Sequence, residues 1–350
     1  MTVLFSHRRP WYVFFLVSFS PYRSVDSTSL LNEAILRKEE NNLEDEVPLK
    51  YGVDVSFPMH HIPSSFSASS CKYTEENRVC KTTPLTKFAQ DRLDYYHYNF
   101  LKGCKAAFGE DCLRSEKERI EMAHRQPQTM KNMTSGLGFR KLRLPPEVFE
   151  SILEFWQTNR HEAYDEPWPA GGTYINHWET PPGVVRVDNT SLPGGGYDLT
   201  SQVWEALRPI VSEWTGQHLE EASMYGIRIY KTGNILATHV DRQPLVSSVI
   251  INVDQDLDEP WPLEVIGHDG LAHNITMEPG DLVLYESHSI LHGRPYPLKG
   301  RFLANMFVHF EPTRPDAPKN SPPIYRLPMK RSDKKCTPTL KQGRVMCIFE

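Results

Sequence analysis

The chain has 350 residues, of which 39% are hydrophobic and 24% are charged, so it can bury a sizeable core and wholesale disorder is excluded. Its formal charge of -5 argues against a general nucleic-acid binder, which needs a basic face. The sequence has neither a Gly triplet period nor a sustained heptad, which excludes collagen and coiled coil, and no apolar run is long enough to span a bilayer.

Residues 1–25 have the pattern of a secretory signal peptide or an uncleaved signal anchor. Basic residues at positions 7–9 precede a short apolar run from Trp11 to Phe19. A buried strand is the alternative interpretation. The pattern predicts entry into the secretory pathway, to the lumen or membrane of the endoplasmic reticulum, with membrane contact only through this segment.

Two segments of different character follow. Residues 26–70 are acidic and end in a Ser-rich stretch, which predicts a loosely ordered linker. Residues 71–135 carry four cysteines and two helical patterns, roughly from Leu85 to Lys102 and from Glu110 to His124. We expect a Cys-containing helical region there, and its role is left open.

The six cysteines and three glycosylation sequons become meaningful if the chain is secreted. An even number of cysteines in such a chain suggests disulfides, and sequential pairing is one of fifteen possible connectivities. The cysteines are Cys71, Cys80, Cys104, Cys112, Cys336 and Cys347. The sequons begin at Asn132, Asn189 and Asn274.

Residues 136–312 carry helices followed by many short strands. Leu144-Pro-Pro-Glu147 predicts a helix start, and a further helix is expected from about Leu199 to Gly216. From Met224 onward short β-rich runs alternate with turns. These runs cover residues 225–230, 245–253, 262–266, 272–276, 281–286, 289–292 and 302–310.

This order of elements predicts an α+β fold. Its core is expected to be a double-stranded β-helix, or jelly roll, buttressed by the N-terminal helices. The acidic stretch Asp254–Glu259 is expected to be a solvated hairpin loop. Residues 313–350 form a Pro-rich, basic tail with two cysteines.

Two motifs in the strand region carry metal-ligand chemistry. His239-Val-Asp241 places an imidazole and a carboxylate at i and i+2, which share one face of a strand. His292 lies downstream in Ser-Ile-Leu-His-Gly-Arg. Two histidines and one carboxylate on one face of an iron form the facial triad of non-haem Fe(II) oxygenases. The H-x-D motif alone is weak evidence, and its order and distance from His292 strengthen it.

An arginine nine residues after His292 adds the charge that a 2-oxo diacid requires. The guanidinium of Arg301 can bind the distal carboxylate of 2-oxoglutarate through two parallel hydrogen bonds. His288 is a rival metal ligand, but the residue nine positions after it is Pro297, which has no such charge. Arg294 is a candidate for the mouth of the site, with a solvated position equally open.

The segments RIYKTGNILATHVD, GDLVLYESHSILHG and RFLANMFVHF resemble the catalytic domain of prolyl 4-hydroxylase alpha subunits, which are Fe(II)/2-oxoglutarate-dependent dioxygenases. The resemblance covers roughly Met224–Phe310. It implies that Tyr230 lies near the iron and the co-substrate and takes part in the site, and that Asn305 supports co-substrate binding. The family's usual Gly-Gly-Glu is absent, and Trp261-Pro-Leu-Glu264 stands in its place.

The resemblance further implies an enzyme that uses Fe(II), 2-oxoglutarate and O2, with ascorbate, and releases succinate and CO2. The expected reaction is hydroxylation of a C–H bond of peptidyl proline in a peptide or protein partner, with no nucleic acid involved. One alternative keeps the chemistry and changes the substrate to another side chain or a small molecule, which the missing Gly-Gly-Glu favours. The other is a non-catalytic jelly-roll binding module. The oligomeric state is left open.

Overall fold

The structure is a computed structural model that describes residues 96–269, 272–314 and 323–326. It also gives the backbone of two separate hairpins, formed by β1 (Ser67–Tyr73) with β2 (Arg78–Pro84) and by β15 (Thr337–Lys341) with β16 (Arg344–Ile348). The signal segment, nearly all of the linker and most of the tail lie outside the described residues. The proposed domain boundaries therefore remain predictions.

The helical elements are η2 (Tyr96–Leu101), α3 (Lys102–Phe108), α4 (Glu110–Thr129), α5 (Pro146–Asn159), η3 (Arg160–Glu162) and α6 (Tyr197–Thr215). The first strands are β3 (Phe139–Arg143), β4 (Tyr164–Asp165), β5 (Gly183–Val185), β6 (His218–Ser223), β7 (Ile227–Lys231) and β8 (Leu236–His239). The later strands are β9 (Ser247–Leu257), β10 (Leu263–Ile266), β11 (Ala272–Ile275), β12 (Asp281–Tyr285), β13 (His292–Arg294) and β14 (Gly300–Thr313). None of the helices in this described part combines the length and apolar composition needed to cross a bilayer.

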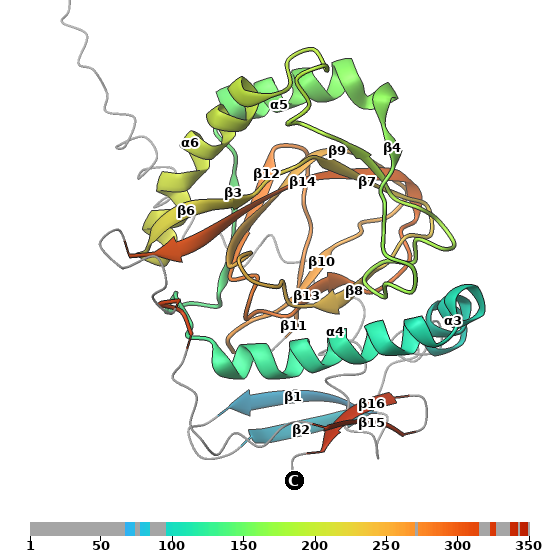
Figure 1. The fold of residues 1–350 in the computed structure, drawn as a ribbon. Coiled ribbons are helices and arrows are strands. Elements are labelled where there is room, and N and C mark those ends of the chain that lie inside the picture. Colours follow the sequence, from blue (N-terminus) through green and yellow to red (C-terminus); the bar gives the residue numbers. More distant parts are fainter. Residues whose placement is uncertain are drawn as a thin grey trace, which may run out of the picture. The chain divides into compact units, whose positions relative to one another are not determined.

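The strands form two antiparallel sheets that face each other (Figure 1). The eight-stranded sheet runs β3-β12-β9-β14-β7-β5-β4, with β6 paired to β14, and the four-stranded sheet runs β11-β10-β13-β8. Apolar side chains of both sheets meet between them, as where Ile250 of the larger sheet and Val265 of the smaller one belong to one buried cluster. The predicted α+β fold with a jelly-roll core is confirmed.

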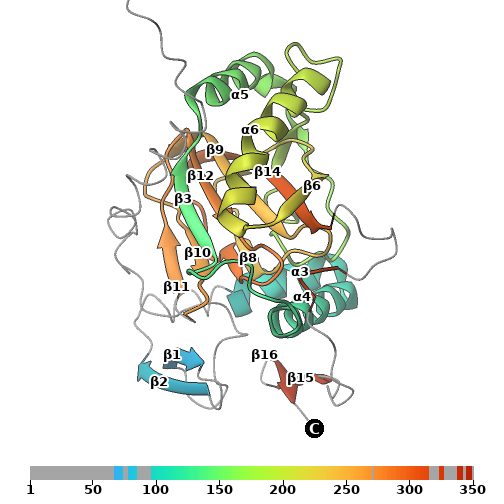
Figure 2. The same cartoon turned by 90° about the vertical axis from the view of Figure 1, so that its left-hand side faces the viewer.

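Helices α5 and α6 cover the outer face of the larger sheet (Figure 1, Figure 2). Both carry apolar residues at helical spacing, so each helix can bury one side. The Trp204 ring of α6 meets the Phe310 ring edge-on, with 4.9 Å between their centroids. The indole nitrogen of Trp156 in α5 donates a hydrogen bond to Asp254 at 2.8 Å. These helices buttress the sheet, as the sequence predicts.

Helix α4 packs against the smaller sheet, on the opposite side of the jelly roll (Figure 1). Its Ile120 and Ala123 belong to one buried cluster with Val240, Ile266 and Leu291. This helix lies in the predicted Cys-containing region, before residue 136. Its buried face nevertheless contacts the strands that carry the H-x-D motif.

Helices α3 and α4 meet at Gly109, where a disulfide also joins them. Gly109 has φ of 60°, a left-handed conformation that glycine adopts without steric cost. Cys104 and Cys112 are bonded and fully buried. The side chains of the other four cysteines lie outside the described residues.

Several elements differ from the sequence predictions. A helix was predicted from about Leu85 to Lys102. The structure describes this segment only from Tyr96 onward, where it forms η2 and the start of α3. The run at 289–292 is mostly irregular, and β13 starts only at His292. The strands β3 and β6 were not predicted, since FRKLR and HLEEAS lack a clear apolar alternation.

Candidate metal centre

The two histidines of the predicted triad lie directly opposite each other on neighbouring strands. In the antiparallel register of β13 with β8, His292 faces His239. Asp241 follows the end of β8, and its backbone N–H donates to the carbonyl of Ser287 at 2.7 Å. Strand pairing and this loop contact therefore bring three side chains from distant parts of the chain to one place.

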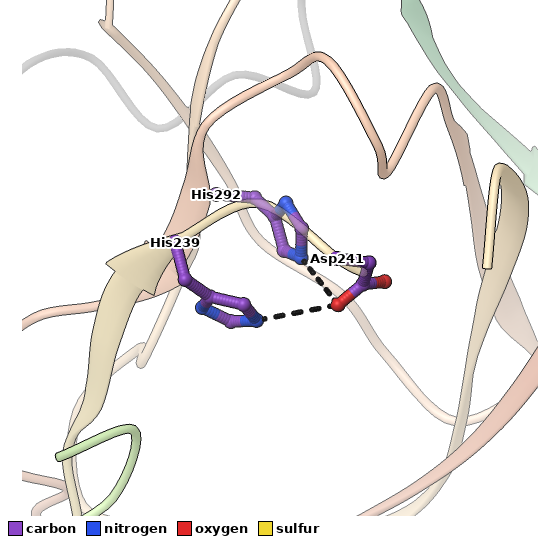
Figure 3. A group of neighbouring side chains, drawn as sticks. All are labelled: His239, Asp241 and His292. Carbon is purple, nitrogen blue, oxygen red and sulfur yellow. Dashed lines mark ion pairs between the residues drawn. The ribbon is translucent and has the colours of Figure 1, made fainter. Parts of the chain in front are cut away.

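The potential ligand atoms converge (Figure 3). Oδ1 of Asp241 lies 3.5 Å from Nε2 of His239 and 3.8 Å from Nε2 of His292. One ligand atom from each residue lies within 4.8 Å of the others. Atoms that each coordinate a single ion at about 2 Å must lie this close together. His239, Asp241 and His292 can therefore share one metal.

Backbone carbonyls hold both imidazoles in the orientation that a metal requires. Nδ1 of His239 lies 2.7 Å from the carbonyl oxygen of Ala237, and Nδ1 of His292 lies 2.9 Å from that of Ile290. A carbonyl only accepts, so each Nδ1 carries the proton and donates it. Each Nε2 is then left with a free lone pair, the arrangement found in metal-bound histidines. The donor set fits a divalent iron.

Burial and neighbouring charges shift the pKa values of His292 and Asp241. Burial, with the charge of His239 as a lesser cause, lowers the pKa of His292 to about 4, so its imidazole is neutral at pH 7. Burial alone would raise the pKa of Asp241, but its contacts with His239 and His292 outweigh that effect and hold the pKa well below the usual range. A neutral imidazole at His292 and an ionised carboxylate at Asp241 are the protonation states that metal binding needs.

Three further side chains surround the triad, and sequence reasoning did not identify them. Tyr285 meets the His292 ring edge-on at 4.7 Å, and Tyr174 meets the His239 ring in the same way at 5.2 Å. Nδ1 of His309 lies 3.8 Å from Oδ2 of Asp241. None of the three belongs to a recognisable sequence motif. Alternation along β14, which places His309 on the same face as Asn305, is the one signal that could have identified His309.

The resemblance-based residues Tyr230 and Asn305 both lie inside the jelly roll. Tyr230 is fully buried, its ring 5.1 Å from that of Trp261, and its hydroxyl accepts a hydrogen bond from Arg228 at 3.4 Å. Asn305 is also buried, and its Oδ1 accepts from Arg294 at 3.2 Å. Within the described residues, Asn305 therefore contacts Arg294, and Tyr230 contacts Trp261.

Arg301 is not brought to the triad. Its side chain is 56% exposed, and its guanidinium forms ion pairs with Asp256 and Asp258 of the neighbouring strand and hairpin. A break in the pairing register with β9 between Gly300 and Phe302 precedes this orientation. The side chain of Arg301 is therefore held at the surface by two carboxylates. Its spacing from His292 had predicted a position beside the co-substrate.

His288 and Arg294 are both buried, in different surroundings. Nδ1 of His288 donates to the carbonyl of Val246 at 3.0 Å, and the residue is outside the triad cluster. Arg294 is 2% exposed, so it lies neither at a solvated mouth nor on the surface. Burial lowers the pKa of Arg294 to about 10, which still leaves the guanidinium positive at pH 7.

A cluster of partly exposed aromatic rings lies beside β8. The backbone of Tyr174 pairs with β8 through the N–H of Ala237, which donates to the Tyr174 carbonyl at 2.8 Å. Along the same segment, His177 stacks on Phe108 with 5.4 Å between ring centroids and on Trp168 with 6.4 Å. We call Phe108, Trp168, His177 and Trp178 the aromatic cluster.

Comparisons with known proteins find similar folds. No protein-family model matches the chain, and no curated protein matches its sequence. A prolyl-4-hydroxylase of Pseudomonas putida is 16% identical, with a TM-score of 0.40, and the match covers 55% of this chain and 100% of that one. A prolyl hydroxylase of Trichoplax adhaerens, solved with a hypoxia inducible factor peptide fragment, is 12% identical, with a TM-score of 0.40 over 57% and 92% of the two chains.

An oxidoreductase of the 2OG-Fe(II) oxygenase family from Burkholderia pseudomallei is 14% identical, with a TM-score of 0.36 over 50% of this chain and 85% of that one. Because the identities and TM-scores are low, the chemistry of this chain has to follow from its own residues.

Proposed function

We propose that the chain is an Fe(II)- and 2-oxoglutarate-dependent dioxygenase that hydroxylates peptidyl proline. The convergence of His239, Asp241 and His292 carries the proposal, because two imidazoles and one carboxylate fit iron and would leave its other coordination positions open. The open positions suit a bidentate 2-oxo acid and O2.

The chain's own residues hold and shield the reacting groups. Iron and 2-oxoglutarate together would supply the oxidising chemistry, with succinate and CO2 as the by-products. The carbonyls of Ala237 and Ile290 fix the ring orientations of the two histidines. The rings of Tyr174 and Tyr285 flank those imidazoles and keep water from two sides of the site.

Two observations support a proline-containing peptide as the substrate. The motif segments resemble prolyl 4-hydroxylases, and the aromatic cluster lies next to the strand that carries His239. Proline-rich segments dock on surfaces lined by aromatic side chains, because their preformed extended helix loses little entropy on binding. A peptide seated on the cluster would lie beside the metal ligands.

The test is incubation of the protein with Fe(II), ascorbate, 2-oxoglutarate and a proline-rich peptide. We expect succinate and a peptide heavier by one oxygen atom, with hydroxyproline in its fragment spectrum. Production of succinate without a modified peptide would contradict the proposed substrate but not the proposed oxygenase chemistry. A protein that binds no iron, or that binds it equally well after His239→Ala, would instead support a non-catalytic binding module.

A different substrate class has one observation in its favour. Trp261, where the family has its Gly-Gly-Glu segment, packs on Tyr230 and donates its indole N–H to the carbonyl of Tyr296 at 2.6 Å. A bulky ring at this position changes the interior beside the candidate co-substrate site. Screening free amino acids and small molecules for uncoupled succinate release would detect such a substrate.

We also propose that the protein works in the secretory pathway, with ascorbate as the reductant. The basic and apolar start of the chain supports this location. The buried Cys104–Cys112 disulfide supports it as well, because such bonds persist in oxidising compartments. Fractionation of cells that express the full chain would place it, and a cytosolic protein would overturn the proposal.

A further inference from the structure

Arg294 occupies a position from which it can reach a ligand bound to the metal. It lies on β13 two residues after His292. The pairing register with β8 is irregular between these residues, but the extra residue belongs to β8, so alternation along β13 keeps both side chains on one face. Two residues along a strand span about 7 Å. The two backbone positions are therefore close together, and the buried guanidinium lies inside the jelly roll against Trp261 and Asn305.

The charge of Arg294 has no carboxylate partner among the residues that the structure describes. The other fully buried arginine, Arg119, pairs with Glu116 at 2.7 Å, and the largely buried Arg228 pairs with Glu166 at 2.6 Å. Arg294 instead donates to the backbone carbonyl of Trp261 and to the amide oxygen of Asn305. An uncompensated buried cation is costly, so a negatively charged ligand would stabilise it strongly.

The surroundings of Arg294 are built to receive a carboxylate. Its guanidinium lies over the Trp261 ring at 4.9 Å, which fixes the plane of the fork. A guanidinium has five N–H donors, and these two hydrogen bonds leave donors on both terminal nitrogens. Tyr230 and Asn305, which the resemblance assigns to the co-substrate, converge on the same group: Asn305 by its hydrogen bond, and Tyr230 through Trp261.

We propose that Arg294, and not Arg301, binds the distal carboxylate of 2-oxoglutarate. The inference rests on the proposed oxygenase function, since it needs a co-substrate that chelates the metal. The 2-oxo acid end would lie at the triad, and the far carboxylate would pair with the buried guanidinium. Trp261, Asn305 and Tyr230 are positioning residues that hold this guanidinium.

The test compares two ligands that differ in one carboxylate. Protein loaded with Mn(II) under nitrogen is titrated calorimetrically with 2-oxoglutarate and with 2-oxopentanoate, which has the same carbon count and no distal carboxylate. We expect Arg294→Gln to weaken 2-oxoglutarate binding roughly 10- to 100-fold, the range for loss of a charged hydrogen-bonded pair. Binding of 2-oxopentanoate should not change, and Arg301→Gln should affect neither ligand.

Each other outcome decides against the proposal in a different way. A selective loss of 2-oxoglutarate with Arg301→Gln would overturn it in favour of the spacing-based residue. An equal loss of both ligands with Arg294→Gln would make Arg294 a structural residue. A wild-type protein with metal but no affinity for 2-oxoglutarate would overturn the oxygenase proposal itself. If Arg294→Gln does not fold, Arg294→Lys keeps the charge and should retain a reduced preference for the diacid.

Discussion

At the scale of single residues, the metal centre depends on which imidazole nitrogen is free. His239 and His292 both commit Nδ1 to a carbonyl, so only Nε2 is available to an ion. We expect His292→Ala and Asp241→Ala each to lower Fe(II) affinity by at least about 100-fold, more than loss of a supporting hydrogen bond would. Anaerobic equilibrium dialysis measures the affinity directly.

His288→Ala is the matched control for this prediction. His288 is a buried histidine four residues from His292, and its Nδ1 is also bonded to a carbonyl. It lies outside the ligand cluster, so the variant should bind Fe(II) as the wild type does. Equal losses in His288→Ala and His292→Ala would show that the ligand assignment is wrong.

The same histidine makes stability depend on pH in a way that can be measured. Burial lowers the pKa of His288 from 6.5 to about 4, and its Nε2 has no hydrogen-bond partner among the described residues. Between these two values the unfolded chain binds the proton more readily than the folded one, so stability falls as the pH falls through this window. From pH 7 to pH 5 this single group should remove about 2 kcal/mol from the unfolding free energy.

Urea unfolding of the metal-free protein at the two pH values measures this effect. His309 and His292 have lowered pKa values as well, so only the difference between variants isolates His288. We expect His288→Gln to show a smaller loss of stability on acidification than the wild type. An identical loss in both proteins would contradict the assignment of this titration to His288.

The residue scale also explains why the side chain of Arg301 lies on the surface. The residue nine positions after His292 is Arg301. Leu303 and Asn305 point into the jelly roll, so regular alternation along the strand would turn the side chain of Arg301 inward as well. The register break at Gly300 ends that alternation, as a β-bulge re-aims side chains. Gly300 has φ of 141°, and a Cβ there would lie 2.6 Å from the carbonyl oxygen of Asp256. No pattern in one sequence reveals such a local irregularity.

At the scale of elements, α4 supports the strand that carries His239. Arg119 of this helix donates to the carbonyl of Thr238, the residue before His239, and pairs with Glu116 through two hydrogen bonds at 2.7 and 3.1 Å. Arg119→Met would leave the buried Glu116 carboxylate without its arginine partner. The cost of breaking one side of such a pair is about 3–5 kcal/mol.

A double substitution separates this cost from loss of packing. Adding Glu116→Gln to Arg119→Met removes the unpaired charge, so the double variant should regain at least about 1 kcal/mol over the single one. Chemical unfolding of the single and double variants measures both values. If the two variants are equally stable, the ion pair does not account for the role of Arg119.

Elements were predictable where a local pattern fixes them. The helix from Glu110 and the helix near Leu199–Gly216 follow from apolar spacing, and they appear as α4 and α6. The strand β3 has no such pattern, and it is a strand because it pairs with β12, far along the chain. Long-range pairing of this kind decides which polar segments become strands, and it leaves no local signal.

At the scale of the whole molecule, the aromatic cluster links the N-terminal helices to the jelly roll. Phe108 is the last residue of α3, and it stacks on His177 beside the metal strand. We expect Phe108→Ala to raise the KM for a proline-rich peptide roughly 2- to 10-fold, the range for one aromatic contact. The affinity for 2-oxoglutarate should not change, because the described ring contacts of Phe108 are with His177 and Trp178 of the aromatic cluster.

Steady-state kinetics with varied peptide, combined with calorimetry for the co-substrate, separates these two quantities. Tyr197→Ala is the control, since Tyr197 is an aromatic residue that is 80% exposed on α6, on the opposite side of the jelly roll from α4. An equal change of peptide KM in both variants would show that the aromatic cluster does not bind the substrate.

The proposed passage through the secretory pathway leads to a last prediction, about which sequons carry glycans. Asn132 is exposed, and Asn189 lies in a surface turn where its Oδ1 accepts from the backbone of Ser191 at 3.0 Å. Asn274 is 2% exposed in β11, and its Oδ1 accepts from the Tyr296 hydroxyl at 3.3 Å. A glycan on Asn274 would prevent β11 from packing, so folded protein should carry glycans only at the other two sites.

Intact-mass spectrometry of the full chain purified from secretory cells tests this directly. We expect Asn132→Gln and Asn189→Gln each to remove one glycan, while a conservative change at Asn274 removes none. A glycan on Asn274 in folded protein would contradict the buried position of that strand. Protein without any glycan would instead count against the secretory location, because in that pathway the two accessible sequons should be glycosylated.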